Sequence, residues 1–179
     1  MQVDLAGTAY ILDAFARVIA PGGAGIVVAS MAGHRESPYS REIEDALATT
    51  PAAQLLALPF LQPGQVGSTV HAYALAKRAN SLRVLTAAAA WDRRGARVNT
   101  ISSGVIITPL ALDELSGPRA QWFEHVRTTC AAKRFSTSDE VAQAAAFLLG
   151  HQVGFITGAD LLIDGGVTAA LRPGELTTP

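Results

Sequence analysis

Tyr73 and Lys77 are the residues of this chain whose types and spacing are best suited to chemistry. They stand four positions apart, so on a helix their side chains share one face, with Cβ atoms about 5 to 6 Å apart. A free tyrosine has a pKa near ~10 and carries little phenolate at neutral pH. A neighbouring ammonium stabilises the phenolate, and a desolvated cleft strengthens that effect. The pair therefore predicts a tyrosine that exchanges a proton with a substrate.

Ser30 is a third candidate, because it ends the β-branched run GIVVAS at the carboxyl end of an expected strand. A hydroxyl there would hydrogen-bond a carbonyl oxygen while Tyr73 supplies the proton and a nicotinamide supplies a hydride. Simpler interpretations stay open at this point, since a Tyr and a Lys are four apart in many helices by chance and a serine can merely end a strand. A serine hydrolase is excluded, because the residues around Ser30 lack both glycines of a nucleophile elbow.

The segments that must position these residues alternate between helical and strand-like patterns. Apolar spacing, turn residues and a capping box at Thr137 and Glu140 predict helices over 5–20, 68–91, 119–131 and 137–149, and strands over 25–30, 96–102 and 159–163. Residues 103–118 are expected to form a loop, and residues 34–67 an irregular insertion around a short helix at 41–48. The pattern predicts an α/β fold with a doubly wound parallel sheet of the Rossmann type, whose ligands bind beyond the carboxyl ends of the strands.

Composition narrows the functional classes further. The 179 residues carry a formal net charge of -1, so there is no basic excess that would favour nucleic acid. Cys130 is the single cysteine, and with four scattered histidines it gives no spacing typical of a metal site. No apolar run approaches the ~20 residues that span a bilayer, and the acidic Asp4 stands where a signal peptide carries positive charge. We expect a cytoplasmic protein without a nucleic-acid, membrane or metal partner.

Five segments, in order along the whole chain, resemble the short-chain dehydrogenase/reductase family from its fourth helix onward. They are residues 3–7 (VDLAG), 26–33 (IVVASMAG), 73–77 (YALAK), 97–104 (RVNTISSG) with Thr108-Pro109, and 156–166 (ITGADLLIDGG). Each motif is short, and their common order makes the resemblance specific.

The resemblance implies an NAD- or NADP-dependent oxidoreductase that interconverts an alcohol and a ketone. By it, Tyr73 is the acid/base, Lys77 binds the nicotinamide ribose and tunes Tyr73, and Ser30 orients the substrate. The residues that it implies at the nicotinamide end of the cofactor are Tyr73, Lys77, Gly104, Ile106 and Thr108.

The insertion at 34–67 and the ending Leu171-Arg172-Pro173 most resemble the bacterial 3-alpha-hydroxysteroid dehydrogenase/carbonyl reductases within the family. The insertion leaves the expected sheet after Ser30 and returns before the helix of Tyr73, so we expect it near the substrate cleft or at a subunit interface. Its apolar residues either line a pocket for a small hydrophobic alcohol or ketone or pack on a second copy in a homo-oligomer, a dimer or tetramer. Those residues are Leu55, Leu56, Leu58, Phe60 and Leu61.

Two departures from the family pattern concern the site itself. Asp4 stands in place of an asparagine that holds a water relay toward the lysine, which makes it a further catalytic candidate. Its charge near Lys77 would partly cancel the effect of the ammonium on Tyr73. Ser103 replaces a proline and is expected to loosen the loop that follows it.

The largest departure concerns the cofactor. The sequence holds no G-x-x-x-G-x-G between a strand and a helix to receive a pyrophosphate, so it resembles the carboxyl-terminal portion of the family's domain. We therefore expect residues 1–179 to form a single partial domain, in which the strand at 25–30 has an unpaired edge that favours pairing with another chain. The competing hypothesis is a truncated, non-catalytic remnant that acts as an oligomerisation module or has no activity.

Overall fold

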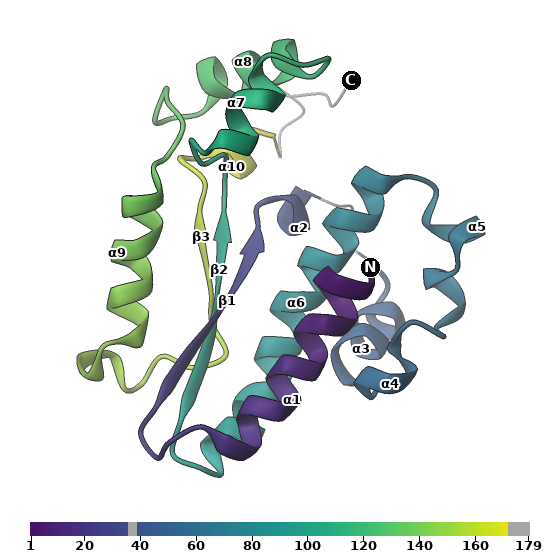
Figure 1. The fold of residues 1–179 in the computed structure, drawn as a ribbon, viewed down its shortest axis with the longest axis vertical. Helices are drawn as coiled ribbons and strands as arrows, with labels where there is room; N and C mark the ends of the chain where they lie inside the picture. Colours follow the sequence, from purple (N-terminus) through teal and green to yellow (C-terminus); the bar gives the residue numbers. More distant parts are fainter. Residues whose placement is uncertain (36–38, 172–179) are drawn as a thin grey trace.

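A computed structural model describes residues 1–35 and 39–171, arranged around a parallel sheet (Figure 1). The three strands lie in the order β1 (Ala24–Ser30), β2 (Arg97–Ser103), β3 (Asp160–Ile163). In the register, Ser30 is paired with Ser103, and Ser103 with Ile163. The carboxyl ends of the strands are therefore flush. The three predicted strands are confirmed.

Helices cover both faces of the sheet (Figure 1). On one face, α6 (Thr69–Asp92) contacts β1 and β2, and α1 (Thr8–Val18) packs on α6. On the other face lies α9 (Ser138–Leu149), which opens with the predicted capping box between Thr137 and Glu140. This arrangement confirms the predicted doubly wound fold of the Rossmann type.

The packing of α6 on β1 is closest near the amino end of the sheet. A Cβ at Gly25 would lie 2.6 Å from Cη2 of the Trp91 indole, so only glycine fits there. The Trp91 side chain is buried, and its Nε1 donates to the carbonyl of Leu12 on α1. Together with Val84 and Val98, these side chains form the core between helices and sheet. This contact sets the distance between α6 and the strands.

The first helix has an irregular start. Residues Gln2–Gly7 form a π-helical segment, η1, that continues directly into α1. Asp4 lies in η1, and its backbone carbonyl accepts a hydrogen bond of 3.0 Å from the Thr8 hydroxyl. The predicted helix over 5–20 is confirmed in position, and π segments of this kind are frequent at functional sites.

The insertion at 34–67 contains more helix than expected. Its elements are α2 (Ala32–Arg35), α3 (Arg41–Thr49), α4 (Ala52–Leu55), η2 (Pro59–Leu61) and α5 (Pro63–Val66). The predicted helix at 41–48 is α3. Pro59 and Pro63 suggested irregular backbone, but each begins a helical turn, where its missing N–H needs no partner.

The apolar residues of the insertion pack mainly inward. Leu55 and Leu61 are buried in a core cluster with Leu47 and with Leu75 of α6. The location of the insertion near the substrate cleft or at a subunit interface stays a prediction. Residues 36–38 and the ending Arg172-Pro173 lie outside the described part of the chain.

The loop predicted over residues 103–118 is wrong in its second half, which forms helix α7 (Pro109–Leu115). The Thr108 hydroxyl accepts a hydrogen bond of 3.2 Å from the amide of Ala111, and Pro109 occupies the first helical position. These are two standard helix-start features. The helix predicted at 119–131 is confirmed as α8 (Ala120–Thr129), and the remaining elements are η3 (His151–Val153) and α10 (Val167–Leu171).

The described residues offer neither a membrane span nor a metal cluster. None of their helices is both long and apolar enough to cross a membrane, and no three His, Cys, Asp or Glu side chains among them are grouped to hold a metal ion. Cys130 is a free and buried thiol that contacts the carbonyls of Arg127 and Arg134. It therefore serves packing in this fold.

Candidate active site

A cleft of about 490 Å³ lies at the carboxyl edge of the sheet, next to α6, α7 and α8. Its lining includes most of the residues predicted from the sequence, namely Ser30, Tyr73, Gly104, Ile106 and Thr108. Lys77 and Asp4 do not line the cleft. Lys77 lies beside the Tyr73 ring, and Asp4 lies beside Lys77. All of the predicted site residues are thus close to one edge of the sheet.

Tyr73 and Lys77 share one face of α6, as their spacing predicted. The Tyr73 side chain is 44% exposed, so a substrate can reach its hydroxyl. The Lys77 ammonium lies 5.5 Å from the centre of the Tyr73 ring. Only 14% of the Lys77 side chain is exposed, so little water screens its charge from the ring. The ammonium and the ring therefore form a cation–π contact.

The Lys77 ammonium is held by two further partners. It lies 3.4 Å from Oδ1 of Asp4 and donates a hydrogen bond of 3.3 Å to the carbonyl of Val28. The Gly23 carbonyl and the Met31 amide both form hydrogen bonds with β2, so the odd-numbered residues of β1 direct their backbone groups toward β2. The even-numbered residues, including Val28, therefore direct theirs toward the outer edge of β1. Lys77 is therefore fixed between a carboxylate on η1 and the outer edge of β1.

Ser30 is placed at the cleft by the turn that follows β1. Its Oγ accepts a hydrogen bond of 3.2 Å from the amide of Ala32, the first residue of α2. Because the acceptor side of the hydroxyl is used in this way, its O–H can donate to a substrate oxygen. The start of α2 thus holds the Ser30 hydroxyl at the lining of the cleft.

The backbone after β2 passes very close to the end of β3. A Cβ at Gly104 would lie 2.8 Å from Cα of Asp164, so this approach requires glycine. Ser103, which stands in the place of a family proline, is the last residue of β2, and its carbonyl accepts from the amide of Met31 at 2.8 Å. The chain around Gly104 is therefore held by strand contacts on both sides.

The segment from Val105 to Thr108 is paired with the residues that precede α9. Ile106 forms a parallel bridge with Ser136. The Ile107 amide donates to the Ser136 carbonyl at 2.9 Å, and the Ser136 amide donates to the Val105 carbonyl at 3.0 Å. Thr108 then caps α7. The predicted nicotinamide contacts thus lie on a backbone that is anchored at several points.

The opposite wall of the cleft consists of residues that the sequence did not indicate. Trp122 and Phe123 of α8 line it, with ring centroids 4.9 Å apart in an edge-to-face contact. The Arg119 guanidinium lies 5.2 Å from each ring and 3.1 Å from the Glu114 carboxylate, and the Arg35 guanidinium lies 4.9 Å from the Trp122 ring. The adjacent aromatic residues were the only sequence feature that could have indicated this wall. The position of α8 at the cleft depends on tertiary packing, which the local sequence does not record.

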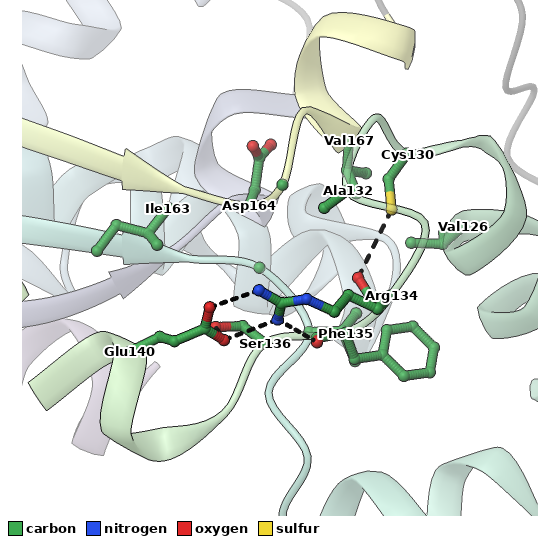
Figure 2. A pocket seen from close by; sticks show the side chains of 13 residues that line it. Val126, Cys130, Ala132, Arg134, Phe135, Ser136, Glu140, Ile163, Asp164 and Val167 are labelled. Carbon is green, nitrogen blue, oxygen red and sulfur yellow. Dashed lines mark hydrogen bonds and ion pairs between the residues drawn. The ribbon is translucent and has the colours of Figure 1, made fainter.

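A second cavity of about 160 Å³ adjoins the first and shares the start of the loop at 104–108 (Figure 2). Figure 2 shows an ion-pair network at its edge, in which Arg134 donates to both carboxylate oxygens of Glu140 at 2.6 and 2.8 Å. The Ser136 hydroxyl donates to the same carboxylate at 3.0 Å. Since Ser136 pairs with the loop, Glu140 supports the loop from outside the cleft.

The Glu140 network makes a prediction about pH. Hydrogen bonds from Arg134, from the Thr137 amide and from the Ser136 hydroxyl hold the pKa of the Glu140 carboxyl well below its usual range. A lowered pKa means that the stabilisation is fully present above the unfolded pKa, near ~4.3, and is lost as the pH falls toward the folded value. Glu140→Gln should therefore lower the free energy of unfolding at about pH 7, and the difference from the unmodified chain should shrink below about pH 4.

Urea denaturation at about pH 7 and again below about pH 4 measures the difference in the free energy of unfolding. Asp45→Asn, which removes an exposed carboxylate outside the network, is the control and should show no such pattern. A destabilisation by Glu140→Gln that is equally large in acid would contradict a role for the ionised carboxylate.

Comparisons with known proteins agree with this geometry. The sequence profile of a family described as Enoyl-(Acyl carrier protein) reductase matches residues 38–168. A short-chain dehydrogenase/reductase of Alternaria brassicicola is 37% identical over 174 residues, which cover 96% of this chain and 62% of that protein. A 3-alpha-hydroxysteroid dehydrogenase/carbonyl reductase of Comamonas testosteroni is 31% identical over 176 residues, which cover 97% of this chain and 67% of that protein.

A solved structure shows the same likeness. The crystal structure of the 3-alpha-hydroxysteroid dehydrogenase from Pseudomonas sp. B-0831, complexed with NADH, superposes with a TM-score of 0.76 at 31% identity. The match covers 97% of this chain and 67% of that one. The chain therefore spans about two thirds of the length of the relatives it matches.

Proposed function

Since the chain belongs to the short-chain dehydrogenase/reductase family, we propose that its cleft interconverts an alcohol and a ketone by hydride transfer with NAD or NADP. The observation that carries the proposal is the convergence of three side chains. Ser30 and Tyr73 line one cleft, and the Lys77 ammonium lies 5.5 Å from the tyrosine ring. The same convergence argues against a non-catalytic remnant.

The roles of these side chains follow from their chemistry. In the reducing direction, the Ser30 hydroxyl donates a hydrogen bond to the carbonyl oxygen, and the Tyr73 hydroxyl gives that oxygen a proton. The Lys77 ammonium stabilises the phenolate that results. In the oxidising direction, the Tyr73 phenolate takes the proton of the alcohol. A nicotinamide dinucleotide would supply or accept the hydride when bound.

The residues of the cleft fit the nicotinamide half of such a cofactor. The Tyr73 hydroxyl, the Lys77 ammonium and the Thr108 hydroxyl are donors suited to a ribose and a carboxamide. The backbone at Gly104 permits a close approach, and Ile106 offers an apolar contact. The sequence contains no glycine-rich turn before a helix for the pyrophosphate, so this chain's contribution to cofactor binding is at the nicotinamide end.

A hydrophobic alcohol or ketone is the substrate class that suits the remaining walls. Val70, Leu110, Trp122 and Phe123 give the cleft a mainly apolar lining. Its volume of about 490 Å³ lies in the usual range for small-molecule sites. Two relatives are named for hydroxysteroids, which supports a bulky apolar substrate.

We further propose a cytoplasmic homo-oligomer, a dimer or tetramer. Cys130 is a free thiol, which suits a reducing compartment. On α1, Ile11, Phe15 and Val18 are exposed, and a second copy would remove this apolar surface from water.

Tyr73→Phe tests the acid/base role. Removing the hydroxyl takes away the proton donor, so carbonyl reduction should fall by about 10² to 10⁴-fold while the melting temperature is unchanged. The assay is carbonyl reduction at one fixed concentration of NADH or NADPH, the same for every variant. Tyr10→Phe, at an exposed tyrosine on α1, is the matched control and should keep full activity. A loss for Tyr73→Phe of less than about tenfold, which is only ~1.4 kcal/mol of barrier, would remove Tyr73 from the mechanism.

Asp4→Asn tests the electrostatics behind the tyrosine. The Asp4 carboxylate lies 3.4 Å from the Lys77 ammonium and offsets part of its charge, so the neutral variant should be more active near neutral pH. Asp45→Asn, on the exposed side of α3, serves as the control. An unchanged rate near neutral pH for Asp4→Asn would mean that the carboxylate does not act on the site.

A further inference from the structure

A hydrogen-bonded pair, His34 and Asp160, lies beneath the turn that carries Ser30. His34 Nε2 and Asp160 Oδ2 are 2.9 Å apart, although the residues are 126 positions apart in the sequence. Both side chains are largely buried, at 22% and 19% exposure. The pair joins α2 to β3, two elements that have no backbone pairing with each other. It has no part in the proton transfer described above.

The helix α2 connects this pair to the catalytic side chains. At its start, the Ala32 amide donates to the Ser30 hydroxyl at 3.2 Å. In its middle, a Cβ at Gly33 would lie 2.7 Å from the backbone nitrogen of Arg78 and 2.9 Å from the carbonyl carbon of Lys77. The single turn of α2 therefore touches both Ser30 and the backbone of α6 at Lys77.

The Asp160 end of the pair is rigidly placed. Asp160 is the first residue of β3 and is paired with Thr100 of β2. Its carboxylate also accepts a hydrogen bond of 3.0 Å from the Ser102 hydroxyl of β2. Burial acts to raise the pKa of the Asp160 carboxyl, but hydrogen bonds from His34, Ser81 and Ser102 outweigh it and hold the pKa below its usual range. Asp160 is thus an ionised anchor fixed by β2 and α6.

We propose that His34 is a positioning residue, which ties α2 to Asp160 and thereby holds Ser30 at a fixed distance from Tyr73. The proposal rests on the proposed function, because it assigns the pair to the geometry of that site. A helix of one turn is not stable by itself, so its position depends on tertiary contacts. His34 supplies one such contact at the end of α2, opposite the Ser30 hydroxyl.

The test compares His34→Ala, His34→Gln and Asp160→Asn with the unmodified chain. Glutamine keeps a neutral N–H donor toward Asp160, whereas alanine removes the contact. His125→Ala, at an exposed histidine on α8, is the matched control. Two quantities are measured: the hydrogen-exchange rate of the Ala32 amide by NMR, and kcat and KM for carbonyl reduction.

His34→Ala and Asp160→Asn should each speed exchange of the Ala32 amide. Each should also lower kcat by about tenfold and change KM by less than about twofold, because small misplacements of reacting groups act mainly on turnover. His34→Gln should keep most of the Ala32 protection and most of the kcat of the unmodified chain. Exchange of the buried β2 amides reports on the global fold and should be unchanged in His34→Ala. If Asp160→Asn does not fold, the alanine and glutamine variants of His34 decide the question.

The proposal is overturned if His34→Ala leaves Ala32 exchange and kcat at the level of His125→Ala. It is also overturned if the β2 amides exchange faster in step with Ala32, because the pair is then an ordinary stabilising contact. Absence of carbonyl reduction by the unmodified chain would refute the proposed function alone. The exchange comparison would still decide whether His34 fixes the Ser30 turn.

Discussion

The close packing of α6 against β1 is the constraint on which the cleft depends. Trp91 can lie over the strand only because residue 25 is glycine, and α2 can touch α6 only because residue 33 is glycine. These two contacts fix α6 at Trp91, near its carboxyl end, and at Lys77 and Arg78 in its first half. Since the register of β1 and β2 sets Ser30 beside Ser103, Tyr73 then meets Ser30 at the carboxyl edge. Side chains from the end of β1 and from α6 therefore form one site.

The lysine of the site is also coupled to the edge of the sheet. Lys77 donates to the carbonyl of Val28 on the outer edge of β1 and lies 3.4 Å from Asp4. A strand that pairs with this edge would need the same backbone groups, so strand addition and the position of the ammonium are linked. The chain spans about two thirds of the length of its relatives.

Much of the architecture could be predicted because local sequence patterns identify its helices and strands. The β-branched run before Ser30 and the capping box at Thr137 each identify an element without tertiary information. The start of α7 at Thr108 was missed, because a Thr-Pro pair fits a loop as well as a helix start. The wall at Trp122 and the pair of His34 with Asp160 depend on contacts between distant segments, which no local spacing records.

Calorimetric titration of residues 1–179 with NADH and NADPH, compared with reduced nicotinamide mononucleotide, tests the central claim that this chain recognises only the nicotinamide end of the cofactor. We expect weak binding, in the millimolar range or weaker, with the mononucleotide about as tight as the dinucleotides. The sequence contains no glycine-rich turn for the pyrophosphate, and hydrogen bonds to charged groups are worth about 1.5 to 3 kcal/mol each. Micromolar affinity for a dinucleotide, far above that for the mononucleotide, would contradict it.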